Sequence, residues 1–330
     1  MPDISTEYMG LKLKSPVIMA SGPLTSHLDD LKRAEDAGAG AVVLKSIFEE
    51  QIEKDAGLDA AENEEYLAHS DSQEYFEAMA RAYYIDRYMT LLEGAKKSLD
   101  IPVIASINCK SISTWLEYSQ NFLSCGADAI ELNYFPIASN ADVSGEAVDK
   151  ALFDFAKSAR GKIEGKLALK IGSFYSSLSS VIKKIDDVGF DGLVLFNRPF
   201  RPDIDLKSLE IRGCKPLSSP DEYGMSLRWT ALMSAEVKLD IAANTGIHSA
   251  DTLIKMLLAG AKAAEVCSAV IKNGFSVIGE MNKGLSAFME EKGYEGTRDF
   301  IALLAEDNYE RGDAWERVQF LKTIGNDNER

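Results

Sequence analysis

Two lysines stand at the ends of apolar segments, where a charged side chain is costly to bury. Lys45 ends the run AVVLK and Lys170 ends LALK, and each run is typical of a strand buried on both faces. A buried ammonium needs an anion or an oxygen-rich ligand, because burying it unpaired is unfavourable. It could instead reach solvent or pair with a carboxylate such as Glu131. Asn133 and Asn197 end similar runs. Lysines and amides in one place favour an oxygen-rich heteroaromatic ligand over a metal ion, which would need grouped His and acidic residues.

Two turns in the last third of the chain form a second candidate site. Ala243–Ile247 (ANTGI) ends one apolar run, Val266–Ala269 (VCSA) ends the next, and a predicted helix start follows each. Turns of this kind can hold a phosphate with backbone N–H groups and a helix N-terminus. Gly246 permits close approach of the backbone and Ser268 adds a hydroxyl donor, although an ordinary capped turn is the alternative interpretation. Together with the lysines and amides, these turns favour a phosphorylated heteroaromatic such as FMN.

A repeated unit positions these residues: an amphipathic segment, a Gly that could end a helix, a short apolar run and a polar residue. It occurs as AGAGAVVLKS, CGADAIELNY, VGFDGLVLFN and AGAKAAEVCS. Four further apolar runs bring the predicted strands to eight; they cover residues 17–20, 102–107, 166–170 and 238–243. Helix–Gly–strand units in series predict an α/β fold, here a (β/α)8 TIM barrel whose strand ends face one mouth. We expect one domain over residues 1–330, with long insertions after strands two (46–101) and six (198–237) that cover the mouth.

Composition excludes several classes of function. The hydrophobic fraction of 46% suffices for a core, and a net charge of −16 argues against binding nucleic acid. Neither a signal peptide nor an apolar stretch of spanning length is recognised, so no membrane contact is expected. Three histidines show no ligand spacing, and the four cysteines contain no Cys-x-x-Cys pair, so we expect no metal and reduced thiols in the cytoplasm. The cysteines are Cys109, Cys125, Cys214 and Cys267. An acidic run in the first insertion is interpreted as a solvated face: Glu49, Glu50, Glu53, Asp55, Asp59, Glu62, Glu64 and Glu65.

Motifs spread along the chain resemble those of one enzyme family. In order, they are MGLKLKSPVIMASGP, VVLKS, IPVIASINC, GADAIELN, LALKIG, LVLFNRP, YGMSLRWTALM and TGIHSADTLIKMLLAGAKAAEVCSAV. From about Tyr8 to its end, the chain resembles the dihydroorotate dehydrogenases, particularly the soluble class, and the FMN domain of dihydropyrimidine dehydrogenase. The pair IPVIASINC and GADAIELN is the most specific match. In YGMSLRWTALM, only Gly224 and Ser226 keep the family pattern.

The resemblance implies roles for individual residues. Lys45 and Lys170 would stabilise negative charge on the reduced flavin, and Asn133 and Asn197 would orient a planar amide-like or pyrimidine-like substrate. The catalytic candidates are Lys45, Asn133, Asn197 and Ser139. The FMN-binding candidates are Ala20, Ser21, Gly22, Lys45, Ser46, Asn133, Lys170, Gly224, Ser226, Thr245, Gly246, Cys267 and Ser268.

The chain departs from the family pattern where the substrate would bind. The family continues its strand-four asparagine as Asn-Leu-Ser-Cys-Pro-Asn, in which the Cys (Ser in membrane-bound relatives) or a nearby Cys acts as base. Here the segment reads Asn133-Tyr134-Phe135-Pro136, and Phe135 cannot accept a proton. Ser139 follows on the same loop and could take that role, although a serine there is often a helix cap. The family's orotate-holding segment is replaced by His69–Phe76, and Asn-Ser after strand six becomes Asn197-Arg198.

These observations predict an FMN-dependent oxidoreductase of pyrimidine metabolism. It would exchange a hydride between flavin N5 and a carbon–carbon bond next to carbonyls; dihydroorotate oxidation is the family reaction. Arg198 would hold a substrate carboxylate or make a surface salt bridge. The alternatives are an FMN enzyme for another substrate, a flavin- or phosphate-binding barrel without turnover, and a lyase or isomerase of a phosphorylated metabolite. A homodimer is also expected, because soluble relatives commonly pair and the second insertion carries apolar residues that could instead fold over the site: Phe200, Ile204, Leu206, Leu209, Ile211 and Leu217.

Overall fold

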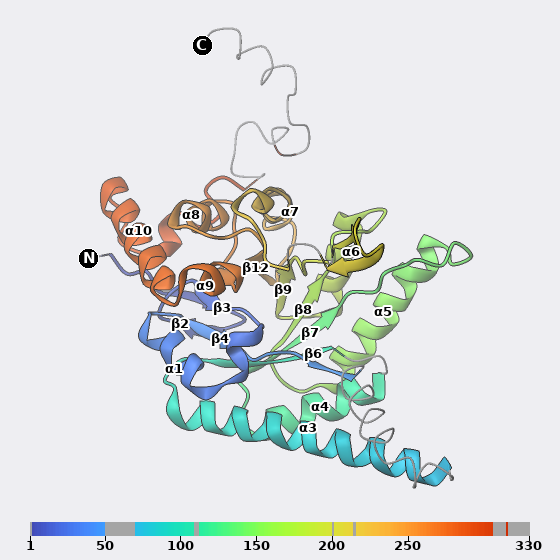
Figure 1. Ribbon diagram of the computed structural model, residues 1–330. Helices are drawn as coiled ribbons and strands as arrows, with labels where there is room; N and C mark the ends of the chain where they lie inside the picture. Colours follow the sequence, from blue (N-terminus) through green and yellow to red (C-terminus); the bar gives the residue numbers. More distant parts are fainter. Residues whose placement is uncertain are drawn as a thin grey trace.

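The predicted barrel is confirmed. The computed structural model describes residues 2–49, 70–108, 112–199, 201–213, 216–305 and 315. Within these ranges, eight parallel strands form a closed sheet (Figure 1), because β13 pairs with β3 and β4 pairs with β6. In order around the barrel they are β3 (Val17–Met19), β4 (Ala41–Val43), β6 (Val103–Asn108), β7 (Ala129–Tyr134), β8 (Leu167–Ile171), β9 (Gly192–Leu195), β12 (Asp240–Asn244) and β13 (Ala263–Val266). The predicted strands differ from these by a few residues at their ends.

Helices surround the sheet, and the glycines of the repeated unit end four of the connections as predicted. Gly38, Gly126, Gly189 and Gly260 have φ between 94° and 109°, a region that favours glycine. The long helix α3, cyan in Figure 1, packs against α1 and α4. The helices are α1 (Leu28–Asp36), α3 (Ser70–Ser98), α4 (Ile112–Ser124), α5 (Gly145–Lys162), α6 (Leu178–Val188), α7 (Gly224–Met233), α8 (Ala250–Leu258), α9 (Ser268–Asn273) and α10 (Ser276–Lys292), with 3-10 turns η1 (Pro23–Ser26), η3 (Pro220–Tyr223) and η4 (Thr297–Asp299).

A hairpin closes the amino-terminal end of the barrel. It consists of β1 (Thr6–Tyr8) and β2 (Leu11–Leu13). The backbone N–H of Met9 donates to Asp240 at the start of β12, and the Lys166 ammonium, just before β8, donates to the carbonyl of Met9. The hairpin thereby adds apolar side chains to the barrel interior. That inner core contains Tyr8, Met9, Leu13, Ile18, Ala41, Val43, Ile104, Ala129, Ala168, Val194, Ala242 and Ala263. The barrel interior next to the hairpin is thus apolar.

The two predicted insertions are only partly described. In the first, β5 (Ile47–Phe48) extends the sheet beside β6 and α3 follows, whereas residues 50–69, with most of the acidic run, lie outside the described residues. In the second, β10 (Pro202–Asp205) and β11 (Glu210–Gly213) form an antiparallel hairpin. Its apolar side chains are exposed, with fractions of 61% for Ile204, 84% for Leu206, 80% for Leu209 and 77% for Ile211. Phe200 lies outside the described residues.

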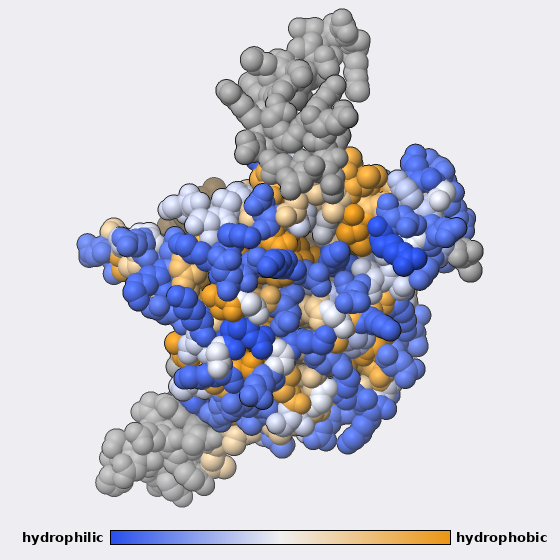
Figure 2. All heavy atoms as spheres, turned by 180° about the vertical axis from the view of Figure 1, so that it is seen from behind, coloured by the Kyte–Doolittle hydropathy of each residue, from blue (hydrophilic) through white to orange (hydrophobic). Residues whose placement is uncertain are grey.

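Hydrophilic residues cover most of one face of the molecule (Figure 2). The face drawn in Figure 2 is mostly hydrophilic, with separate hydrophobic patches. Among the helices of the described ranges, none is long and apolar enough to cross a membrane.

Candidate active site

One cavity at the carboxyl ends of the strands brings most of the predicted site residues together. It has a volume of about 350 Å³. Its lining includes Ala20, Ser21, Gly22, Lys45, Ser46, Asn133, Lys170, Asn197, Thr245, Gly246, Cys267 and Ser268, all of which were candidates from sequence. Lining residues that the sequence analysis did not assign to the site include Pro23, Phe48, Pro216, Ser218, Asn244 and Glu265. The repeated strand ends therefore meet at one place, as the barrel geometry requires.

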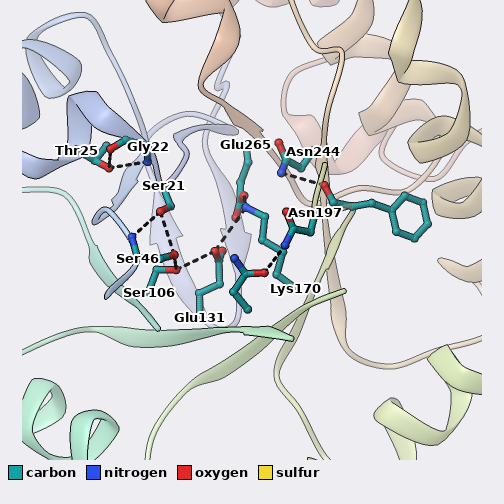
Figure 3. Close-up of polar contacts among 12 residues, drawn as sticks. Ser21, Gly22, Thr25, Ser46, Ser106, Glu131, Lys170, Asn197, Asn244 and Glu265 are labelled. Carbon is teal, nitrogen blue, oxygen red and sulfur yellow. Dashed lines mark hydrogen bonds and ion pairs between the residues drawn. The ribbon is translucent and has the colours of Figure 1, made fainter. Parts of the chain in front are cut away.

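The cavity contains two lysines in different surroundings. Lys170 is buried, and its ammonium lies 2.6 Å from Glu265 Oε2 and 3.5 Å from Glu131 Oε1 (Figure 3). The carboxylate partner that sequence analysis had kept as an alternative is therefore present, and a second one accompanies it. Within the described residues, no side-chain hydrogen bond or ion pair holds the half-buried Lys45. Lys45 is thus the lysine that lacks a protein counter-charge there.

The buried lysine and its partners shift one another's proton affinities. Burial acts to lower the pKa of Lys170, but the carboxylates of Glu131 and Glu265 outweigh it and raise that pKa above the ordinary value. Burial, followed by the charge of Glu265, raises the pKa of Glu131 well above its ordinary value. Cys267, next to Glu265, has a pKa raised by burial. Its thiol is therefore neutral at neutral pH and is no candidate nucleophile.

A chain of hydroxyls connects the buried carboxyl to the cavity (Figure 3). Ser106 Oγ donates to Glu131 Oε1 at 3.4 Å and lies 2.6 Å from Ser46 Oγ. Ser46 Oγ lies 3.2 Å from Ser21 Oγ, and the Ser46 N–H donates to that same oxygen at 2.8 Å. Ser21 and Ser46 line the cavity. The predicted flavin-contacting serines are therefore held in place by the barrel interior.

Strand-end amides form a second polar group on the cavity wall. Asn197 Nδ2 donates to Asn133 Oδ1 at 2.6 Å. Asn244 Nδ2 and Thr245 Oγ1 each donate to the carbonyl of Phe196 at 3.1 Å. The pairing leaves the Asn133 amide nitrogen and the Asn197 amide oxygen for other partners, which gives a donor and an acceptor side by side. Such a pair matches the edge of a planar amide.

The predicted phosphate turns are supported by the second insertion. Ser218 N–H donates to Ser268 Oγ at 2.9 Å, so the Ser268 hydroxyl hydrogen remains for another acceptor. Lys272 Nζ donates to the Ser218 carbonyl at 2.7 Å, which brings a cation beside the turn. His248 Nε2 lies 3.0 Å from Ser218 Oγ, and burial, followed by Lys272, lowers the pKa of that imidazole. Lys272 was missed from sequence, although its position four residues after Ser268 was a usable signal.

Packing against η3 requires glycine at position 246, in addition to the predicted approach of a ligand. Its φ is 78°, and a Cβ there would lie 2.3 Å from the backbone nitrogen of Tyr223 in η3. Ser226 Oγ donates to the carbonyl of Asn244, and Gly224 begins α7. Neither Gly224 nor Ser226 lines the cavity. Ser226 therefore supports the end of β12 from outside the cavity, and Gly224 begins the helix that carries it.

The loop after β7 does not enter this cavity. The Phe135 ring packs on Gly172, where a Cβ would lie 2.0 Å from the ring. Phe135 lines a neighbouring apolar cavity of about 700 Å³ together with Pro136, Ile137, Phe174 and Tyr175. Ser139 is exposed and lines neither cavity. The structure thus does not bring the candidate base Ser139 to the strand-end amides.

Arg198 is already paired. Its Nε donates to Glu222 Oε2 at 2.8 Å, and Arg201 contacts the same oxygen at 2.8 Å. Burial acts to raise the pKa of Glu222, but hydrogen bonds from Arg198 and from the Ser219 N–H lower it to about 2. Of the two predicted roles of Arg198, the structure shows the salt bridge.

Three residues named in the sequence analysis lie outside the described residues: Cys109, Cys214 and His69. The structure therefore does not test the predictions made for them.

Comparison with known proteins identifies the relatives of the chain. No model of a protein family matches it. The catalytic subunit of dihydroorotate dehydrogenase B (NAD(+)) from Methanosarcina mazei is 28% identical over 324 residues, covering 90% of this chain and 94% of the relative. The same subunit from Pyrococcus abyssi is 24% identical over 318 residues, covering 91% and 98%. The chain is a homologue of these subunits.

It is also 23% identical over 363 residues to the NAD-dependent dihydropyrimidine dehydrogenase subunit PreA of Escherichia coli, covering 98% of this chain and 83% of the relative. By name, both kinds of relative are dehydrogenases of reduced pyrimidines.

Proposed function

We propose that this protein is an FMN-dependent dehydrogenase of the dihydroorotate and dihydropyrimidine type, acting in pyrimidine metabolism in the cytoplasm. The observation that carries the proposal is the single cavity in which two lysines, paired strand-end amides and a Gly-Ser turn meet. The dehydrogenase names of the homologues support it. FMN, when bound, supplies the N5 atom that takes up a hydride from the substrate.

The residues of the cavity fit such a group. Ser268, whose hydroxyl hydrogen is not used by Ser218, would donate to the phosphate, with Lys272 as the neighbouring cation. Ser21 and Ser46, held by the hydroxyl chain, would lie against the ring. Lys45, which has no counter-charge within the described residues, would offer its ammonium to an oxygen-rich edge. The residues therefore provide donors from the phosphate end to the ring end of one elongated ligand.

The chain's own residues would also hold the substrate. The Asn133–Asn197 pair offers one free donor and one free acceptor, which suits the amide edge of a pyrimidine ring. Lys45 at the same mouth would stabilise negative charge that develops during hydride transfer. The proton that leaves the substrate needs an acceptor within hydrogen-bond reach, and the loop with Phe135 and Ser139 brings none to the cavity. We propose a reduced pyrimidine as substrate, with a base that differs from the Cys of the family.

Electrons must also leave the protein. The relatives from Methanosarcina mazei and Pyrococcus abyssi are named as catalytic subunits of an NAD(+) enzyme. We propose that here a separate subunit takes up the electrons. Among the described residues, no group of three or more His, Cys, Asp or Glu residues could hold a metal ion.

The test is anaerobic reduction of the FMN-loaded protein. Dihydroorotate and other dihydropyrimidines are mixed with it separately, and the loss of visible flavin absorbance is followed in time. At least one should bleach the flavin, and Lys45→Ala should slow that bleaching by about 10²–10³-fold. The exposed Lys14→Ala is the matched control.

A second candidate function is a flavin-binding barrel without turnover. The position of Ser139 outside the cavity favours it, because the mouth then lacks an acid–base group from that loop. Full FMN occupancy with no bleaching by any dihydropyrimidine would support this second function and contradict the first.

A further inference from the structure

Three ionisable side chains are buried together at the wall of the cavity, and their charges do not balance. The exposed fractions of the side chains are 8% for Lys170, 2% for Glu131 and 1% for Glu265. Two carboxylates and one ammonium would carry a net charge of −1 into a site almost without water. Burying an uncompensated charge is so unfavourable that a buried group takes up or loses a proton instead.

The geometry distinguishes the two carboxyls. Glu265 Oε2 lies 2.6 Å from Lys170 Nζ, a short charge-assisted hydrogen bond, whereas Glu131 Oε1 lies 3.5 Å away. Glu131 Oε1 also accepts from Ser106 Oγ at 3.4 Å. Two carboxylates beside one ammonium also repel each other, and the charge of Glu265 adds to burial in raising the pKa of Glu131. Because Glu265 has the shorter contact with the ammonium, the proton belongs on Glu131, at the oxygen that Ser106 does not occupy.

Two acidic groups beside these three stay neutral, so they leave the charge of the three unchanged. The hydroxyl of Tyr8, in the hairpin below, is buried with no hydrogen-bond partner among the described residues, and burial, followed by Glu265, raises its pKa well above the ordinary value. The thiol of Cys267 is also neutral, because burial raises its pKa. These two neighbouring acids therefore add no further negative charge to the three residues.

We propose that Glu265 is the carboxylate that cancels the charge of Lys170 and that Glu131 keeps its proton, so that the three residues together present no net charge to a bound flavin. Lys45 is then the cation that stabilises the reduced ring, and Lys170 positions the ring through hydrogen bonding. The statement about the flavin rests on the function proposed above, whereas the statement about the proton does not. Glu265 is a positioning residue, since it acts on the ligand through Lys170.

The first test needs no flavin. Infrared spectra of the apoprotein should show the carbonyl band of a buried, protonated carboxylic acid, which shifts in heavy water. Glu131→Gln should remove this band, because the amide replaces the neutral acid with the same shape. A band that persists unchanged in Glu131→Gln, or its absence from the unaltered protein, would overturn the assignment of the proton.

The second test uses the FMN-loaded protein and a reference dye that equilibrates with the flavin. Glu131→Gln should leave the ratio of reduced to oxidised flavin within about twofold of the unaltered protein, because no charge changes. The double variant Glu131→Gln/Glu265→Gln differs from it by one charge and frees the ammonium of Lys170. The ratio should then rise at least about tenfold, the usual effect of a charge within about 6 Å on a neighbouring equilibrium.

The outcomes separate the two proposals. A double variant with the same ratio as Glu131→Gln, or a single variant that already shows the full rise, would contradict the charge assignment. If neither the unaltered protein nor the variants bind FMN, the proposed function fails, and the infrared result still decides where the proton is. Circular dichroism of each variant shows whether it is folded, and the substitutions preserve side-chain shape.

Discussion

The two halves of the barrel mouth are built in different ways. We call the ends of β3, β4, β8, β12 and β13 the cofactor half, and the loops after β7 and β8 the loop half. In the cofactor half, Ser46 and Lys170 are held by hydrogen bonds and ion pairs that reach into the barrel interior. In the loop half, Ser139 is exposed, and Ile137 and Phe174 have exposed fractions of 72% and 74%.

The difference indicates which half is fixed before a ligand arrives. A side chain whose partners are buried strands has its position set by the fold, and such preorganisation suits a permanently held cofactor. A loop with exposed apolar side chains and few buried partners sets no such position. The comparison predicts that the same kind of substitution has different effects in the two halves.

The largest expected effect concerns dihydroorotate. If no base stands in the loop half, the flavin should be reduced by dihydroorotate about 10²–10⁴-fold more slowly than in a relative with the Cys base, measured in a single turnover. Phe135→Cys alone should not restore the rate, because the side chain at this position packs on Gly172 and lines the neighbouring cavity. Rapid bleaching that collapses in Ser139→Ala would show instead that Ser139 moves into the mouth and acts as the base.

The second effect compares one substitution in both halves. Ser268→Asp brings a carboxylate to the predicted phosphate turn, and like charges in contact cost several kcal/mol. The dissociation constant of FMN, measured by fluorescence titration, should rise about 100-fold or more. Ser139→Asp, on the exposed loop, should leave it within about twofold. Equal losses in the two variants would remove the distinction between the halves.

A third, smaller effect concerns stability. A methyl group at Gly172 would collide with the Phe135 ring, and overpacking of this kind costs about 1–3 kcal/mol in the free energy of unfolding. Gly172→Ala should therefore unfold at lower urea concentration while FMN affinity stays unchanged. Gly161→Ala is the matched control, since a Cβ there meets nothing within 4 Å. A loss of FMN affinity in Gly172→Ala would show that the loop half also holds the cofactor.

The smallest effect on the site is expected from the hairpin β10–β11. Its exposed aliphatic side chains support the prediction of a homodimer, because an isolated two-stranded hairpin is marginally stable in water. Leu206→Asp should shift light scattering from dimer to monomer and leave flavin content unchanged. Val143→Asp, which alters another exposed apolar residue, should leave the dimer intact. A monomer at all accessible concentrations of the unaltered protein would contradict the prediction.

Sequence analysis predicted the barrel because its strands are buried on both faces. Continuous apolar runs followed by Lys45, Asn133 or Lys170 locate both the strand and the position of its polar end, and parallel strands bring those ends together. The pairing of Lys170 with Glu265 was not predicted, since it joins strands 95 residues apart. A charged residue inside the apolar run AAEV was nevertheless a usable signal.

Side-chain directions in loops were harder to predict. The substitution of Phe135 for the family's Cys was evident from sequence, but its contact with Gly172 depends on how two loops pack, which no periodicity encodes. Gly246 was assigned to ligand approach, and the structure adds its close contact with the backbone of Tyr223. Turn glycines can serve both purposes, so sequence alone does not separate them.

The absorption spectrum of the purified protein, followed by identification of any released ligand, tests the central claim most directly. The arrangement of Lys45, Ser46 and Ser268 in one cavity predicts a yellow protein that releases FMN in an amount equal to that of the chain. Ser268→Asp should be colourless. A colourless unaltered protein that also fails to bind added FMN would contradict the account.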